Sequence, residues 1–528
     1  MYECPGCGQG LKFDIDSQQL HCEYCGNYYD PDDYERSRNS ENFATYDANV
    51  FVCNQCGGEF ITPDEGVSTF CSYCGAPNIV GNKLTGIKRP EYMISFKINK
   101  DKCKEAYLKR TRKAIYTPRE FKDPEFLDRF RGLYVPYWIY DFAVQGTVKM
   151  KGKKSERHGD YVTTYTAEAR GAVDATYTGI SFDASSTFDD DLAAQIAPYD
   201  FTQVRPFNPT ILSGFYADTE DVPSEVYLDD TAEMVAQEVA TNFSKELTSA
   251  GYVPNELKAD AFGKQLPLFN KTPKGAMFPV WFLSYKKGNK VAYAVVNGVN
   301  GKMACDLPIS FGKFFFGTAI VTVAVFALLN FIIDMTAPVS VVFTAILSVI
   351  MCVLCIANGR SLREKATRED DEGYMYKQGR LSEMDIKDKA SRKIKNAKPR
   401  KTAGAVFATI VTIISLFILM GTGLITLLGY LMARGFFEII VGVILLLVGI
   451  VNLKNCKKTF YIINCITLII AGIVLAFHPV SDMYYYGSAL AIIVTMILSG
   501  LEMFKVHNEL TLRPLPQLSK EGGRERDQ

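Results

Sequence analysis

The sequence predicts a multidomain protein with two small cysteine-rich modules, an α+β domain and a region of membrane-spanning helices. Three observations lead to this division. Eight of the fourteen cysteines lie within the first 74 residues, residues 88–310 contain no long apolar run, and uncharged apolar runs dominate the chain after residue 313. A chain of 528 residues is also too long for a single core, because domains usually contain about 100–200 residues.

The eight N-terminal cysteines form two groups with the same spacing, C-x2-C-x14-C-x2-C, and the second group repeats the first after 49 residues. The groups are Cys4, Cys7, Cys22 and Cys25, then Cys53, Cys56, Cys71 and Cys74. Each C-x-x-C pair is followed by a glycine, which readily adopts the positive φ of a tight turn. Four thiolates close the coordination sphere of Zn²⁺, so each group predicts one structural ion and no catalytic position.

This pattern resembles the zinc-ribbon, rubredoxin-like family, which includes ribbons of the transcription-factor-IIB type. In that family the C-x-x-C cysteines are the metal ligands, and they correspond here to the eight residues above. The resemblance implies zinc ribbon 1 at residues 1–40 and zinc ribbon 2 at residues 49–82. It indicates a metal and a fold, but no function.

Charge argues against the nucleic-acid binding that many such ribbons perform. Residues 1–82 contain three Lys or Arg side chains and thirteen Asp or Glu side chains, a balance of 3 − 13 = −10. Most non-specific affinity for nucleic acid comes from basic side chains that neutralise phosphates. We therefore expect a protein partner, and a membrane-tethered nucleic-acid binder remains the alternative.

The predicted α+β domain at residues 88–310 contains two similar aromatic segments. "GLYVPYWIYDF" starts at residue 132 and "GAMFPVWFLSY" at residue 275, and their Pro-x-Trp motifs hold both tryptophans of the chain. We expect two related halves in which each motif opens a strand, because proline favours a first or edge position. The aromatic side chains predict either core anchors or a ligand site; they are Tyr134, Tyr137, Trp138, Phe278 and Trp281.

Enzymatic motifs are missing from the sequence. It contains no H-E-x-x-H, no G-x-x-x-x-G-K-[ST] and no G-x-S-x-G. The acidic run Asp189–Asp191 has the character of a solvated loop. We therefore expect a protein without enzymatic activity.

Six apolar segments are predicted to cross the membrane, since about 20 apolar residues span the hydrocarbon layer. A transmembrane hairpin at 312–357 contains spans 314–333 and 338–357, and a four-helix module at 403–505 contains spans 404–432, 436–453, 459–477 and 484–504. The intervening loop 358–402 carries fourteen Lys or Arg residues and is predicted to be cytoplasmic. Six spans then place the N-terminus and the tail 506–528 in the cytosol, where the thiols stay reduced.

The order of these parts resembles a family of bacterial zinc-ribbon membrane proteins of poorly defined function. Some of its members accompany phage-shock, SPFH and TPM-type membrane-stress proteins and help to recruit them. The last two spans are weakly similar to HdeD-type membrane proteins, and the four-helix module departs from the first family. These resemblances imply an inner-membrane adaptor whose ribbons bind a cytosolic or membrane protein. A regulated transporter or channel is another hypothesis, with Glu438 as its intramembrane charge near the outer end of a span.

Overall fold

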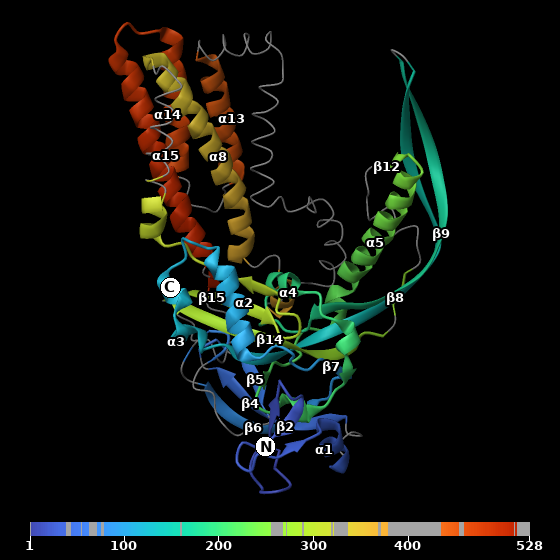
Figure 1. Cartoon of the computed structure of the whole chain (residues 1–528). Coiled ribbons are helices and arrows are strands. Elements are labelled where there is room, and N and C mark those ends of the chain that lie inside the picture. Colours follow the sequence, from blue (N-terminus) through green and yellow to red (C-terminus); the bar gives the residue numbers. More distant parts are fainter. Residues whose placement is uncertain are drawn as a thin grey trace.

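In the computed structural model, the first cysteine module lies at one end of the molecule and the apolar C-terminal helices at the other, with a mixed sheet between them (Figure 1). The structure describes the following residues: 2–38, 44–62 without 54 and 57, 71–158 without 75, 77 and 78, 161–254, 268–317 without 271, 288 and 289, 320, 336–367, 371–377, 435–452, 459–511 and 513–514.

The first cysteine module is a three-stranded antiparallel sheet followed by a short helix. Its strands are β1 (Lys12–Asp14), β2 (Gln19–His21) and β3 (Tyr28–Tyr29), and α1 spans Pro31–Ser37. The side chain of Asp30 caps α1 by accepting hydrogen bonds from the backbone N–H groups of Asp32 and Asp33. The side chains of Leu11, Phe13 and Leu20 are buried and join the core of the α+β domain.

The second cysteine module is part of the main sheet. Its strands are β4 (Thr45–Cys53), β5 (Glu59–Thr62) and β6 (Ile79–Lys88). The sheet runs in the order β10-β7-β14-β8-β11-β5-β4-β6, and β11 joins β5 through the pair Ala217↔Ile61. The second module therefore completes one side of the α+β domain instead of standing beside it.

Two long strands carry the Pro-x-Trp motifs at the centre of this sheet. Strands β8 (Arg131–His158) and β14 (Lys274–Lys287) pair antiparallel, so that Trp138 lies opposite Gly275 and Trp281 opposite Gly132. The expectation that each motif opens a strand is wrong, because both prolines lie five residues inside. Proline lacks only the backbone donor, and the carbonyl groups of Pro136 and Pro279 accept hydrogen bonds from Ala184 and Gly298.

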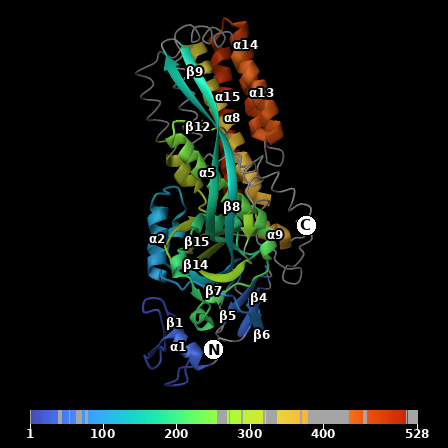
Figure 2. The ribbon, with the colours of Figure 1, turned by 90° about the vertical axis from the view of Figure 1, so that its right-hand side faces the viewer.

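Strands β8 and β9 (Tyr161–Asp183) continue beyond the sheet as a long paired ribbon, which runs toward the viewer's side in Figure 2. Helix α5 (Leu228–Ser249) covers one face of the ribbon with Val235, Val239 and Leu247. Gly171 of β9 allows this close packing, because a Cβ atom there would lie 2.5 Å from the ring of Phe243.

The remaining elements of the α+β domain are short or lie at its periphery. The helices are α2 (Lys100–Arg112), α3 (Pro124–Leu127) and α4 (Asp190–Ile196), with 3-10 turns η2 (Arg119–Lys122), η3 (Phe201–Gln203), η4 (Pro209–Leu212) and η5 (Ser224–Tyr227). The strands are β7 (Tyr92–Met93), β10 (Arg205–Pro206), β11 (Tyr216–Ala217), β12 (Val253–Pro254), β13 (Leu268–Asn270), β15 (Lys290–Asn297) and β16 (Met303–Cys305).

The described helices of the C-terminal bundle are α8 (Ala337–Thr367), α13 (Phe436–Asn452), α14 (Thr459–Phe477) and α15 (Asp482–Thr511). Helix α9 (Glu372–Lys377) lies outside the bundle, and strand β17 (Arg513–Pro514) follows α15. Three segments are long and apolar enough to cross a membrane: Ala337–Ile356, Thr459–Phe477 and Asp482–Lys505. They coincide with three predicted spans, and the predicted span 436–453 contains a shorter apolar helix, Glu438–Ile450. Predicted span 404–432 and most of 314–333 lie outside the described residues.

The bundle has an apolar outer surface and a polar seam inside. Ile463, Ile466, Ile470 and Ile473 form an exposed stripe along α14, as contact with lipid requires. Inside, the Asn464 amide donates to Cys352 Sγ at 3.3 Å and accepts from the Thr495 hydroxyl at 3.1 Å. This network joins α8, α14 and α15.

Candidate metal centres

The four C-x-x-C turns share one backbone hydrogen bond. In each turn, the N–H of the first cysteine donates to the carbonyl oxygen five residues later, at 2.7–3.0 Å. The pairs are Cys4 to Gln9, Cys22 to Asn27, Cys53 to Gly58 and Cys71 to Ala76. Gly8 and Gly26 have φ values of +76° and +74°, as predicted, whereas Gly57 and Gly75 lie outside the described residues.

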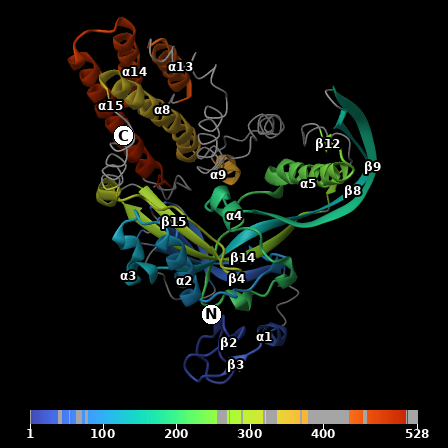
Figure 3. The same ribbon diagram turned by 45° about the horizontal axis from the view of Figure 1, so that its top comes forward.

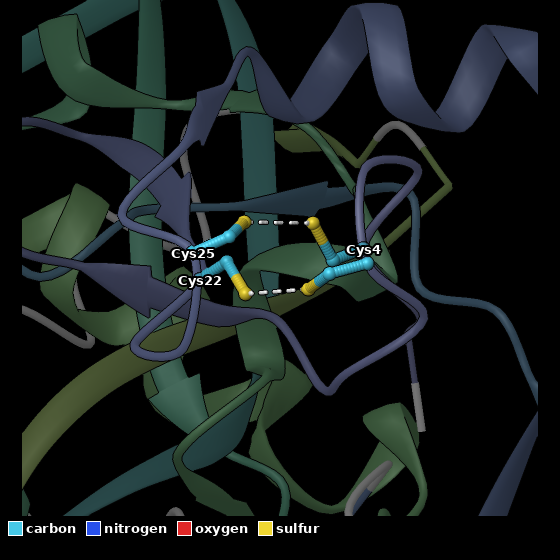
Figure 4. A group of neighbouring side chains, drawn as sticks. Cys4, Cys22 and Cys25 are labelled. Atoms are coloured by element: carbon cyan, nitrogen blue, oxygen red, sulfur yellow. Dashed lines mark hydrogen bonds between the residues drawn. The ribbon is translucent and has the colours of Figure 1, made fainter.

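These turns bring all eight predicted ligands into two groups of four sulfur atoms. Within each group the Sγ atoms all lie within 4.8 Å of one another. The contacts are Cys4–Cys25 at 3.5 Å, Cys7–Cys22 at 3.5 Å, Cys53–Cys74 at 3.5 Å and Cys56–Cys71 at 3.8 Å. Figure 4 shows the sulfur atoms of the first group turned toward a common centre.

The sulfur separations fit a tetrahedral ion. A Zn–S bond of about 2.3 Å places tetrahedral ligands about 3.8 Å apart, and the four Sγ–Sγ contacts of 3.5–3.8 Å lie close to this value. Each group could therefore hold one metal ion, and four sulfur ligands would leave no open position for a substrate.

The first centre lies near the molecular surface. Cys25 is exposed and Cys7 partly so, while Cys4 and Cys22 are buried. The hydroxyl of Tyr29 lies 3.5 Å from Cys4 Sγ, and this contact lowers the pKa of the Cys4 thiol to about 6. Beside the centre, Tyr24 is 80% exposed.

Polar contacts hold the first module against the α+β domain. The Arg89 guanidinium donates to the Glu35 carboxylate at 2.8 Å, and the side chain of Glu35 is only 2% exposed. The Gln18 amide donates to the carbonyl oxygen of Phe96 at 2.7 Å, and the backbone N–H of Phe13 donates to Ser213 at 3.0 Å. These contacts tie the orientation of the first centre to the domain.

The second centre lies in the core of the α+β domain. All four of its cysteines are 0% exposed. Tyr73, between the last two ligands, stacks on Phe60 at 5.0 Å and meets the edge of Phe282 from β14 at 5.6 Å. Burial raises the pKa of the Tyr73 hydroxyl well above its ordinary value. The second centre therefore supports the packing between β5 and the central strands.

The aromatic residues considered as a ligand site serve as core residues in three separate clusters. Trp138 packs with α5, Tyr137 and Phe278 stack at 4.7 Å in a second cluster, and Tyr134 and Trp281 belong to a third. Each indole N–H donates to a backbone carbonyl, Trp138 to Val222 at 2.8 Å and Trp281 to Ile98 at 2.7 Å. The core-anchor interpretation fits this arrangement.

Two other acidic positions are buried, and the first of them differs from its sequence interpretation. Asp189 caps α4 and is buried, and neighbouring Asp190 contacts the segment after α8, so this run is no solvated loop. Glu438 is 2% exposed, and neither of its carboxylate oxygens has a hydrogen-bond partner among the described residues. It packs against α14, where a Cβ atom at Gly472 would lie 3.0 Å from Glu438 Cβ.

The chain is a distant homologue of the uncharacterized protein YdjG of Bacillus subtilis (strain 168). The two are 27% identical over 316 residues, which cover 59% of this chain and 91% of that protein. No family model matches the chain, and no solved structure matches it. Two fifths of the chain thus lie outside the region shared with this relative.

Proposed function

We propose that this protein is a non-enzymatic membrane adaptor in which zinc ribbon 1 binds a protein partner and zinc ribbon 2 is structural. Both ribbons hold one Zn²⁺ in this proposal. The observation that carries it is the exposed metal knuckle of the first ribbon, at the end of the molecule opposite the apolar helices (Figure 3).

The exposed knuckle has the chemistry of a protein-binding surface. Tyr24 is 80% exposed and Tyr28 is 51% exposed, and the ring of Tyr28 stacks on His21 with centroids 4.4 Å apart. Rigid tyrosines are common among the residues that dominate binding energy at interfaces. The metal and the stacking would hold them in place before the partner arrives, which reduces the entropic cost of binding.

The acidic surface of the first ribbon indicates what kind of partner it would bind. Residues 2–38 contain eight Asp or Glu side chains and three Lys or Arg side chains. The carboxylates of Glu23, Asp32 and Asp33 stay 67%, 51% and 73% exposed although each pairs with a basic side chain. A protein with basic side chains surrounding an apolar centre would complement this surface, whereas the phosphate backbone of a nucleic acid would be repelled.

Contacts between the α+β domain and two helix ends support an arrangement in which the domain, the C-terminal end of α8 and the C-terminal end of α15 all lie on the same side of the membrane. Asn508 near the end of α15 exchanges two hydrogen bonds of 2.8 Å with Ile309, and β17 pairs with β15. At the other end of α8 from Ala337, Glu372 contacts Asp190. In the proposal this side is the cytosol, with six spans and both termini inside.

The test uses the full-length protein in native membranes, because ribbon 1 is packed on the domain. Chemical crosslinking and mass spectrometry would compare the wild type with Y24A/Y28A. Y161A/Y165A is the matched control, since Tyr161 and Tyr165 are 81% and 49% exposed at the far end of the β8–β9 ribbon.

We expect the wild type and the control to capture the same protein in similar amounts. Y24A/Y28A should capture at least about tenfold less of it, because loss of an interface anchor costs about 1.4 kcal/mol or more of binding free energy. Equal capture by both double variants would refute the proposal.

Glu438 supports a second candidate, a transporter or channel. A buried intramembrane carboxylate without a hydrogen-bond partner among the described residues is a typical element of an ion or proton pathway. Proteoliposomes would show a flux that E438Q abolishes. Absence of flux for protons and common cations in wild-type vesicles would exclude this candidate.

A further inference from the structure

Helix α9 is the first described element after α8, and it is seated on the α+β domain. The N–H of Glu372 donates to Asp190 Oδ2 at 2.7 Å. The fit is close, because a Cβ atom at Gly373 would lie 3.0 Å from the hydroxyl oxygen of Tyr227 and 3.1 Å from Val222 Cγ2. Since α9 begins five residues after α8 ends, this contact links a candidate membrane span to the domain.

The contact buries several carboxyl groups together. Asp183 and Asp371 are each 1% exposed, and Glu372 is 4% exposed. Asp190 accepts a hydrogen bond from the Tyr227 hydroxyl at 3.0 Å. In contrast, Asp183 Oδ2 has no hydrogen-bond partner in the described part of the chain, and neither Asp183 nor Asp190 forms a salt bridge there.

Among the described residues, the ionisable groups that act on this pair are acidic or phenolic. Asp190 lies on α4, and its neighbours are carboxyl or phenol groups. They are Tyr137 of β8, Tyr199 before η3, Tyr227 of η5, and Asp371 and Glu372 at the start of α9, while Asp189 and Asp191 of α4 flank Asp190 and bond to Leu192 and Gln195 instead. Burial and the nearby carboxyl groups of Asp190 and Asp371 raise the pKa of Asp183 well above its ordinary value, and burial and Asp371 do the same for the pKa of Asp190.

We propose that Asp183 and Asp190 form a proton-binding site that holds α9 on the α+β domain when it is protonated and releases α9 when it is deprotonated. A shared proton would remove the repulsion between the two carboxylates and supply the donor that Asp183 Oδ2 lacks. Because deprotonated carboxylates without a cation are costly to bury, the domain would expose them by releasing α9.

The sign of the effect follows from the proton balance. The carboxyl group of Asp371, at the start of seated α9, contributes to the raised pKa of both aspartates, so the seated state would bind more protons than the released state. Its stability is therefore fully present at low pH and is lost as the pH rises through the raised pKa values. The membrane helix α8 and the domain would thus be connected at low pH and uncoupled at high pH.

The test is hydrogen exchange of residues 371–377 in the full-length protein in lipid nanodiscs, at several pH values between about 5 and 9, with rates corrected for the intrinsic pH dependence of exchange. We expect wild-type protection to fall at least about tenfold as the pH rises, which equals about 1.4 kcal/mol. Constant wild-type protection would overturn the proposal without any variant.

Three variants sharpen the result. D183N/D190N keeps the shape and the acceptor for Glu372 N–H without ionisable groups, so its protection should stay high at all pH values. G373V should abolish protection at all pH values, because its side chain would clash with Tyr227. D191N is the control and should behave as the wild type, since the Asp191 carboxylate accepts a hydrogen bond from Gln195 at 3.1 Å. A pH dependence that persists in D183N/D190N, or protection that EDTA removes at low pH and thus requires a metal ion, would contradict proton binding.

Discussion

The two cysteine modules have the same ligand spacing and the same turns, yet their surroundings are opposite. Both contain a tyrosine directly before the last cysteine, Tyr24 in the first and Tyr73 in the second. Tyr24 is 80% exposed and Tyr73 is 1% exposed. The first module covers the surface of the domain, whereas the strands of the second continue its sheet. The ligand pattern therefore specifies the local fold, and the rest of the chain decides whether that fold becomes core or surface.

The largest expected difference between the two modules is the loss of stability when two of their cysteines, the candidate metal ligands, are replaced. C53S/C56S removes two of the four sulfur atoms that could hold an ion in the second group, and a structural zinc site contributes about 10–16 kcal/mol to folding, as much as the whole net stability of a typical domain. We expect this variant not to fold, while C4S/C7S keeps the sheet. Thermal unfolding of detergent-purified protein would measure the difference, and similar melting of both variants would contradict it.

A smaller difference is expected for the equivalent tyrosines. Y73A removes a ring that contacts Phe60 and Phe282 and should lower the free energy of unfolding by about 3–5 kcal/mol. Y24A removes an exposed ring and should change it by less than about 0.5 kcal/mol. Chemical denaturation monitored by fluorescence would test both, and a loss of stability in Y24A comparable to that in Y73A would erase the distinction.

The attachment of the first module depends on a buried ion pair. E35Q leaves Arg89 without its carboxylate and should weaken docking by about 3 kcal/mol. Trypsin cleavage at Arg36 and Arg38 should accelerate roughly 100-fold, because cleavage follows the opened population. D33N is the control, since the Asp33–Arg36 pair is exposed and worth less than about 1 kcal/mol. Equal cleavage of E35Q and wild type would show that other contacts dominate.

The smallest effect concerns access to the thiols of the intact protein. Cys25 is exposed, whereas all four cysteines of the second module are buried. Alkylation in the presence of a chelator should therefore modify the first module at least about tenfold faster, since the second requires opening of the sheet. Mass spectrometry of the labelled peptides gives both rates, and faster labelling of Cys53 or Cys74 would reverse the comparison.

Local features of this molecule were predictable from the sequence, and long-range ones were not. The spacing of Cys4 to Cys74 identified both groups of sulfur atoms that could hold a metal ion, and apolar length identified three helices that are long and apolar enough to span a membrane. The burial of the second group depends on pairing between Ala217 and Ile61, which no local pattern indicates.

The other failures have the same origin. Pro136 and Pro279 suggested strand starts, because proline loses a donor, yet the packing of both tryptophans places them inside central strands. The acidic run at Asp190 looked solvated, because its partner Glu372 lies 182 residues away. The sequence contained the residues of these sites, but their contacts arise only from the tertiary fold.

The most direct test of the account is hydrogen exchange of C4S/C7S in lipid nanodiscs. The account predicts faster exchange in residues 2–38 and in the segments that contact them, Ser95–Phe96 and η4, with unchanged protection of β8 and β14. The same loss of protection in β8 and β14 would contradict it, because the first module would then be as much a part of the core as the second.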